Sequence, residues 1–77
     1  MITVKLYAYL REPHGKEVQL EYEAGMRVRD IAKALDIPLD RVSIIICDGK
    51  DGIPKKMLDH EVKADSTVHF FPPVAGG

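Results

Sequence analysis

The sequence ends in HFFPPVAGG, residues 69–77, which joins two rigid prolines to a diglycine and its carboxylate. Pro72 and Pro73 fix their φ angles, so we expect the chain to leave the folded part as a stiff, polyproline-like segment. Residues 74–77 would reach about 13 Å further when extended at ~3.3 Å each. Gly76 and Gly77 have no Cβ and could enter a channel too narrow for side chains. A carboxylate delivered in this way needs activation, which implies ATP and a separate activating enzyme.

The same diglycine has a simpler interpretation, because chain ends are usually disordered. Glycine makes up about 7% of residues, so two in succession end roughly 0.5% of chains by chance. The pattern on its own therefore leaves two alternatives open. Either the carboxylate takes part in chemistry, or the terminus is merely frayed.

Size, charge and cysteine content exclude several other classes of protein. The 77 residues suffice for one small domain, and a net charge of −1 leaves no basic stripe of the kind that binds nucleic acid. No apolar run is long enough to span a bilayer, and the first residues, MITVKLYAYLRE, alternate instead of forming the continuous apolar region expected of a signal peptide. The single cysteine, Cys47, cannot form an intrachain disulfide, which fits a reducing compartment. We therefore expect a cytoplasmic protein without a nucleic-acid or membrane partner.

The elements that must position the C-terminus begin with a predicted hairpin. Apolar residues occupy every second position from Ile2 to Leu10, which predicts a half-buried strand that includes Ala8. Glu12–Lys16 contains Pro and Gly and predicts a turn. The returning strand, residues 17–23, carries glutamates on its outer face. Such a row is typical of an edge strand, because charge discourages pairing with foreign chains.

One short helix is predicted after the hairpin. Apolar residues recur at i, i+3, i+4 and i+7 from Val28 to Leu35. Pro38 restricts the residue before it, so the helix should end near Asp36. Arg27 is a poor N-cap, and Asp30 partly compensates as an anion in the first turn.

The remaining half of the chain predicts strands around this helix. Residues 42–49, VSIIICDG, read as a strand buried on both faces and closed by an Asp-Gly turn. Residues 50–66 predict a short strand and a tight turn, and Thr67–Phe71 predicts the last strand. A single helix on a mixed sheet makes an α+β fold. Without repeats or linkers, we expect a single domain over residues 1–77, with 72–77 as an extended, flexible tail.

Three stretches of the sequence resemble the MoaD/ThiS family of ubiquitin-like sulfur carriers. They are MI-V--YA--RE--G over residues 1–15, LDH at Leu58–His60, and FFPPVAGG at residues 70–77, of which the last is the most specific. The resemblance implies a β-grasp fold, a mixed sheet of four to five strands packed on one main helix. The double proline favours the branch of molybdopterin synthase small subunits, since thiamine-pathway carriers usually lack it.

What the resemblance implies is a carrier rather than an enzyme. An E1-like adenylyltransferase would adenylate Gly77 with ATP and Mg²⁺, and a persulfide donor would convert it to a thiocarboxylate. The carrier, a monomer when alone, would then dock on the large subunit of molybdopterin synthase and give its sulfur to a pterin precursor. The chain itself would hold no cofactor, metal or catalytic residue. Three alternatives remain: a modifier conjugated to lysines, a carrier for thiamine or tRNA thiolation, and an interaction module with an idle tail.

The candidate partner surface lies beside the tail. In a β-grasp sheet the first and last strands are neighbours, so outward-facing Tyr7, Tyr9, His69 and Phe71 would form an aromatic patch with Arg11 at its rim. Ordinary cross-strand packing is the alternative to docking. Cys47 is expected to be buried and inert, and the histidines are too scattered for a metal site. The full set of predicted partner-binding residues is Tyr7, Arg11, His69, Phe71, Pro72, Pro73, Val74 and Ala75.

Overall fold

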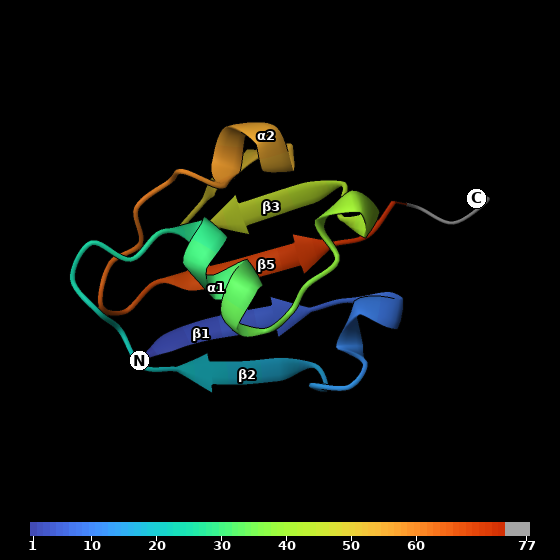
Figure 1. The fold of residues 1–77 in the computed structure, drawn as a ribbon, viewed down its shortest axis with the longest axis horizontal. Coiled ribbons are helices and arrows are strands. Elements are labelled where there is room, and N and C mark those ends of the chain that lie inside the picture. Colours follow the sequence, from blue (N-terminus) through green and yellow to red (C-terminus); the bar gives the residue numbers. More distant parts are fainter. Residues whose placement is uncertain (74–77) are drawn as a thin grey trace.

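The fold is taken from a computed structural model of the chain, which describes residues 1–73. Its strands and helices are arranged as one mixed sheet with a main helix (Figure 1). No helix among residues 1–73 is long and apolar enough to cross a membrane. In chain order the elements are β1 (Ile2–Leu6), the 3-10 helix η1 (Ala8–Arg11), β2 (Glu17–Leu20), α1 (Val28–Ala34), the 3-10 helix η2 (Leu39–Arg41), β3 (Ile44–Cys47), β4 (Lys50–Gly52), α2 (Pro54–Met57) and β5 (Thr67–Phe71).

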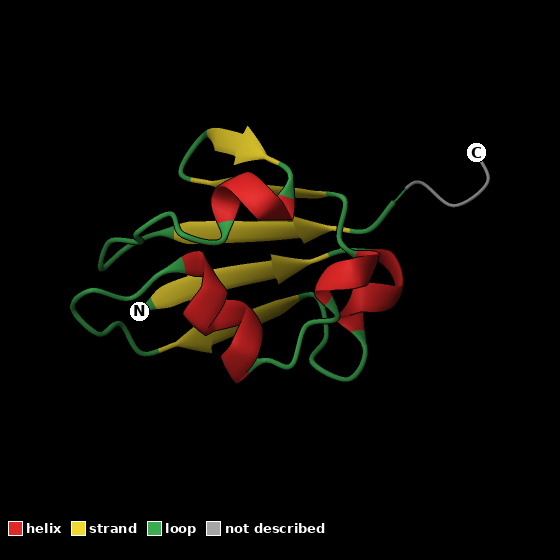
Figure 2. Cartoon of the chain, turned by 45° about the horizontal axis from the view of Figure 1, so that its top comes forward, coloured by secondary structure: helices red, strands yellow, loops and turns green. Residues whose placement is uncertain are grey.

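The five strands follow the order β2-β1-β5-β3-β4, which confirms the predicted α+β class. The first and last strands, β1 and β5, lie parallel at the centre, and the other neighbours are antiparallel. The main helix α1 crosses one face of this sheet (Figures 1 and 2). We call the opposite side, which carries no helix in the part of the chain that the structure describes, the open face.

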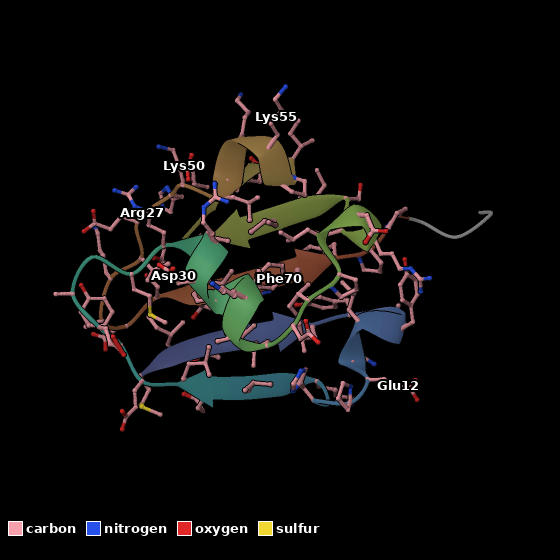
Figure 3. The ribbon with its side chains drawn as sticks, viewed as in Figure 1. Glu12, Arg27, Asp30, Lys50, Lys55 and Phe70 are labelled. Carbon is pink, nitrogen blue, oxygen red and sulfur yellow. The ribbon has the colours of Figure 1, made fainter. Side chains whose placement is uncertain are left out.

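Alternation along the central strands divides their side chains between the two faces. Ile2, Val4 and Leu6 of β1 and Val68 and Phe70 of β5 are buried, and the residues between them are only half-buried. Figure 3 places Phe70 on the covered side, behind α1. Because the period of a strand is two, the pattern of the sequence correctly assigned each of these residues to its face.

The predicted continuation of the first strand to Leu10 is wrong. β1 pairs with its neighbours only as far as Leu6, and Ala8, the first residue of η1, takes a left-handed conformation with φ 53°. Leu10 is nevertheless buried, because η1 turns it back into the core. An apolar residue at position 10 fits the alternating pattern whether it is buried in a strand or in a turn. The pattern therefore could not reveal that the strand ends at Leu6. The return strand likewise ends early, at Leu20.

The main helix begins without a side-chain N-cap, because Arg27 offers no acceptor. The carboxylate of Asp30 accepts the N–H of Arg27 at 2.8 Å, as its place in the first turn predicted. The N–H groups of Val28 and Arg29 donate to the backbone carbonyls of His60 and Leu58 at 3.0 and 2.9 Å. The segment 58–60, the LDH of the family resemblance, thus satisfies donors that a capping side chain would otherwise take.

The end of the helix lies where Pro38 predicted it. Asp36 has φ 56°, a left-handed residue of the kind that ends many helices. The ring Nε2 of His14 lies 2.7 Å from the carbonyl oxygen of Leu35, so Nε2 carries the proton and donates. His14 therefore acts as a structural partner of the last helical turn.

Residues 50–66 contain the predicted short strand, β4, and one element that was not predicted. Asp48 and Gly49 form the expected turn, with φ angles of 51° and 84°. Where only a tight turn was predicted to follow that strand, Pro54 starts the helix α2, since proline is well suited to the first helical turn. Met57 of this helix is buried against the core, and a Cβ on Gly52 would approach its Cγ to 3.1 Å. Gly52 therefore allows α2 to pack closely over β4.

Candidate functional site

Three rings stack on the open face where β1 and β5 end. Tyr7 lies over Phe71 with ring centroids 4.2 Å apart and planes 12° from parallel, and His69 lies 5.9 Å from Tyr7. The parallel register, in which Leu6 faces Phe70, brings these residues together although about 60 positions of sequence separate them. The structure thus forms most of the patch that the sequence predicted. We call Tyr7, His69 and Phe71 the aromatic stack.

A hydrogen bond holds the stack together. The hydroxyl of Tyr7 lies 2.9 Å from Nδ1 of His69. Partial burial, and secondarily the charge of Lys5, lower the pKa of His69 from its ordinary value. His69 is therefore neutral at pH 7, so that Nδ1 can accept the proton of the hydroxyl. Stacked pairs of this kind contribute about 0.5–1.5 kcal/mol beyond the area they bury, which favours one fixed arrangement of the rings.

Arg11 also lies at the predicted place, on the rim of the stack. It comes from η1, and its Nε donates to the backbone carbonyl of Leu6 at 3.1 Å. The guanidinium carbon lies 5.9 Å from the centroid of the Tyr7 ring, within the range of a cation–π contact. The early end of β1 makes this possible, because η1 folds Arg11 back over the last strand residue.

Tyr9 does not belong to the stack, and here the prediction is wrong. It lies on η1 rather than on a strand, is 45% exposed, and its hydroxyl points to the carbonyl of Arg41 at 3.4 Å. The prediction placed Tyr9 on the same face as Tyr7 because residues two apart share a face in a strand, and it assumed that the strand continued beyond Tyr7. The left-handed Ala8 between the two tyrosines breaks that alternation.

Ile44 and Ile46 of β3 extend the open face beside the stack, and the sequence analysis missed them. In the register of β3 and β5, Ile44 faces Phe71 and Ile46 faces His69. Both are half-buried, whereas Ile45 and Cys47, which alternate with them along β3, are fully buried. Residues 42–49 were predicted to be buried on both faces because four successive apolar residues hide the alternation. The open face therefore presents a wider apolar surface than the aromatic residues alone.

Backbone hydrogen bonds hold the last strand in place as far as Phe71, directly before the tail. The carbonyl of Phe71 accepts the N–H of Ser43 at 2.8 Å, and Pro72 follows half-buried while Pro73 is exposed. Figure 1 shows η1, η2 and the end of β5 at the same end of the sheet. The predicted site residues Val74, Ala75, Gly76 and Gly77 lie outside the described residues.

Cys47 is buried, as predicted. Burial, with the neighbouring charge of Asp48 as the next cause, raises the pKa of its thiol to about 11. At neutral pH the side chain of Cys47 is therefore mainly a neutral thiol, and a nucleophilic role for Cys47 is disfavoured.

The three histidines lie in separate places. His69 is in the stack, His14 contacts the end of α1, and His60 follows α2. Among residues 1–73, no three His, Cys, Asp or Glu side chains cluster as metal ligands.

Comparison with known proteins gives two kinds of match. A family model, described as the ThiS family, matches residues 4–77. A solved structure from Pyrococcus furiosus, described as a candidate molybdopterin converting factor, subunit 1, is 25% identical, with TM-score 0.72 over 95% of this chain and 97% of that chain. SAMP1 from Haloferax volcanii is 23% identical, with TM-score 0.74 over 99% of this chain and 98% of that chain. No curated protein matches the sequence. The two structures confirm the predicted ubiquitin-like β-grasp fold.

Proposed function

The chain belongs to the ThiS family of small ubiquitin-like sulfur carriers, and we propose that it carries sulfur on Gly77 for the synthesis of molybdopterin. The observation that carries this proposal is the family match, which runs through the diglycine to Gly77. The order of the chain supports the proposal, because Pro72 and Pro73 directly follow β5 and lead to that diglycine.

The proposed chemistry turns an inert carboxylate into a sulfur nucleophile in two stages. In the active site of an E1-like enzyme, the Gly77 carboxylate attacks the α-phosphate of ATP, whose Mg²⁺ partly neutralises the phosphates, and pyrophosphate leaves. The terminal sulfur of a persulfide donor then attacks the acyl adenylate and releases AMP. A thiol reduces the resulting acyl disulfide, which leaves the thiocarboxylate on Gly77. ATP and Mg²⁺ act in the activating enzyme.

The role of the folded part is to dock and to aim the tail. We assign docking to the aromatic stack, with Arg11 on its rim and Pro72 to Ala75 entering the partner's channel. The three rings are half-buried, and partly accessible aromatic side chains are enriched at protein interfaces. Members of this family are small carriers, and catalysis here is assigned to the activating enzyme and to the large subunit of molybdopterin synthase.

The molybdopterin branch rests on two observations. The double proline of FFPPVAGG resembles that branch rather than the thiamine carriers. The Pyrococcus structure, whose description names molybdopterin, shares 25% of its residues with this chain over nearly its whole length. We place this chemistry in the cytoplasm, with the carrier monomeric until it meets a partner.

The first test is the intact mass of the protein after incubation with ATP, an E1-like enzyme and a persulfide donor. We expect a gain equal to the exchange of one oxygen for sulfur, and no gain in a variant that lacks Gly77. Adducts linked to lysines, without the sulfur gain, would instead indicate a protein modifier. If neither product forms with an enzyme active on other carriers, the proposal is refuted.

The second test separates docking from ordinary packing in the stack. Phe71→Ser should weaken binding to the activating enzyme by about 30-fold or more, as for an aromatic hot spot of ~2 kcal/mol. Ile53→Ser is the matched control, because Ile53 is 50% exposed and lies between β4 and α2, away from the stack. Equal affinities of the two variants would contradict the docking role.

A further inference from the structure

Beside the aromatic stack, the open face has a hollow of about 230 Å³. Its lining combines three cationic side chains with a single carboxylate, and it shares Tyr7 with the stack. The residues around it are Lys5, Leu6, Tyr7, Arg11, Lys16 and Glu17. An excess of positive charge next to an apolar docking surface points to an anionic group on the partner.

Arg11 is already held in position to receive such a group. Its Nε is occupied by the carbonyl of Leu6, and its guanidinium lies over the ring of Tyr7. Within residues 1–73, no acceptor contacts its two terminal nitrogens. A planar guanidinium with free terminal nitrogens matches the two oxygens of a carboxylate, and its fixed orientation reduces the entropy lost on binding.

Glu17, the carboxylate that lines the hollow, contacts Lys5 and Gln19. Glu17 lies 3.9 Å from the ammonium of Lys5, and its other oxygen accepts a hydrogen bond from Gln19 at 3.2 Å. Lys16 makes no ion pair within the described residues, and its backbone carbonyl is fixed by the N–H of Leu6 at 2.9 Å. Among residues 1–73, the charges of Arg11 and Lys16 therefore have no ion-pair partner at the edge of the stack.

We propose that this hollow binds an Asp or Glu side chain of the activating enzyme, with its two oxygens on Arg11 and the charge of Lys16 beside them. The proposal rests on the function proposed above and adds the chemistry by which the partner is recognised. Stacked rings contribute apolar area but accept a partner in several orientations. A carboxylate held by two hydrogen bonds fixes one orientation of the partner on the stack. It thereby also fixes how the partner receives the tail, which begins next to the stack.

The test measures binding to the activating enzyme without ATP, by calorimetry at low and high salt. Arg11→Lys keeps the charge but loses the paired hydrogen bonds, and should weaken binding about tenfold; Arg11→Glu should weaken it about 100-fold. Lys16→Glu leaves the contacts of Arg11 in place, so it tests the charge even if Arg11→Glu disturbs η1. It should weaken binding severalfold and reduce the dependence on salt.

Lys55→Glu is the matched control, with the same change of charge. Lys55 is exposed on α2, at the other edge of the sheet from the hollow (Figure 3). Carbodiimide, which joins amines to carboxylates in contact, should link Lys16 or Lys5 to an Asp or Glu of the enzyme. Replacement of that enzyme residue by Lys should then restore the binding of Arg11→Glu.

The inference is overturned if Arg11→Glu and Lys16→Glu bind as tightly as Lys55→Glu, or if the wild-type protein does not bind the enzyme. Cross-links confined to lysines outside the hollow would also overturn it. Loss of binding in both variants, together with a wild-type protein that gains no sulfur, would uphold the carboxylate site and refute the carrier chemistry. The two proposals therefore fail separately.

Discussion

Asp48 is the side chain whose removal should most clearly weaken the support of β5. It follows β3 in a left-handed conformation, and one of its carboxylate oxygens accepts the hydroxyl proton of Ser66. Its other oxygen accepts the N–H of Thr67 at 3.1 Å, at the first residue of β5. Ser66 is only 1% exposed, and its Oγ also accepts the N–H of Lys63 at 2.7 Å. One carboxylate thus joins the β3–β4 turn to the strand that leads to the tail.

The cost of Asp48→Ala can be worked from these contacts. A buried hydroxyl without its acceptor costs about 1–3 kcal/mol. Alanine at φ 51° adds roughly 1 kcal/mol of backbone strain, which Asp tolerates better. We therefore expect about 2–4 kcal/mol out of a total near 4–11 kcal/mol for a chain of this size. Asp48→Gly removes the same contacts without the strain, and should be about 1 kcal/mol more stable than Asp48→Ala.

Urea unfolding of both variants, with thermal melts, is the assay. Each kcal/mol should lower Tm by about 4–8 °C. The hydrogen bond from Ser66 is the main cause that lowers the pKa of Asp48. Its contribution is therefore present above the unfolded pKa, near 3.9, and is lost as pH falls through the lower folded value. The difference between wild type and Asp48→Asn should accordingly shrink at acidic pH.

A double-mutant cycle with Ser66→Ala decides whether the reasoning is right. If the two side chains depend on each other, Asp48→Ala with Ser66→Ala should cost clearly less than the sum of the single changes, because no buried hydroxyl is left unpaired. Strict additivity would refute this account, as would a loss below about 0.5 kcal/mol for Asp48→Ala, the level of ordinary surface substitutions.

Three further predictions concern His69, Cys47 and Asp30. Because the pKa of His69 is lowered, its stabilising neutral form is retained above the unfolded pKa of about 6.5 and lost as pH falls through the folded value; an NMR titration midpoint at or above 6.5 would contradict this. With its thiol pKa raised to about 11, Cys47 should react with iodoacetamide at pH 8 only after unfolding, and rapid labelling of the folded protein would show the assignment to be wrong. Asp30→Ala removes the acceptor of the Arg27 N–H and should cost about 1 kcal/mol in urea unfolding, against no change for exposed Lys33→Ala.

Local patterns were sufficient where a residue's neighbours in sequence decide its conformation. The alternation in β1 and β5, the spacing in α1 and the Asp-Gly turn were all confirmed, since each depends on a period or on a backbone preference. The patterns failed at Ala8 and at Pro54. At Ala8 the chain turns into η1, and at Pro54 it begins α2, because Leu10 and Met57 are buried in the shared core. No local signal in the sequence reports this burial.

The candidate site shows the same division. Tyr7, His69 and Phe71 could be assigned to one face from the alternation of the first and last strands, which still holds at Tyr7, directly after β1. Ile44 and Ile46, in contrast, were hidden in an unbroken apolar run. Tyr9 was misplaced because alternation was extended past the end of β1. Neither the contact of Arg11 with Leu6 nor the hollow beside it could be read from the residues alone.

The sequence by itself determined the tail, with its double proline and diglycine, and the faces of the central strands, because both depend on the covalent chain and its nearest neighbours. Only the tertiary structure decided that the rings of residues 7, 69 and 71 stack beside the guanidinium of Arg11. Parallel pairing of the first and last strands brings together residues 62 positions apart, and that pairing is selected by burial of the whole core rather than by any local segment.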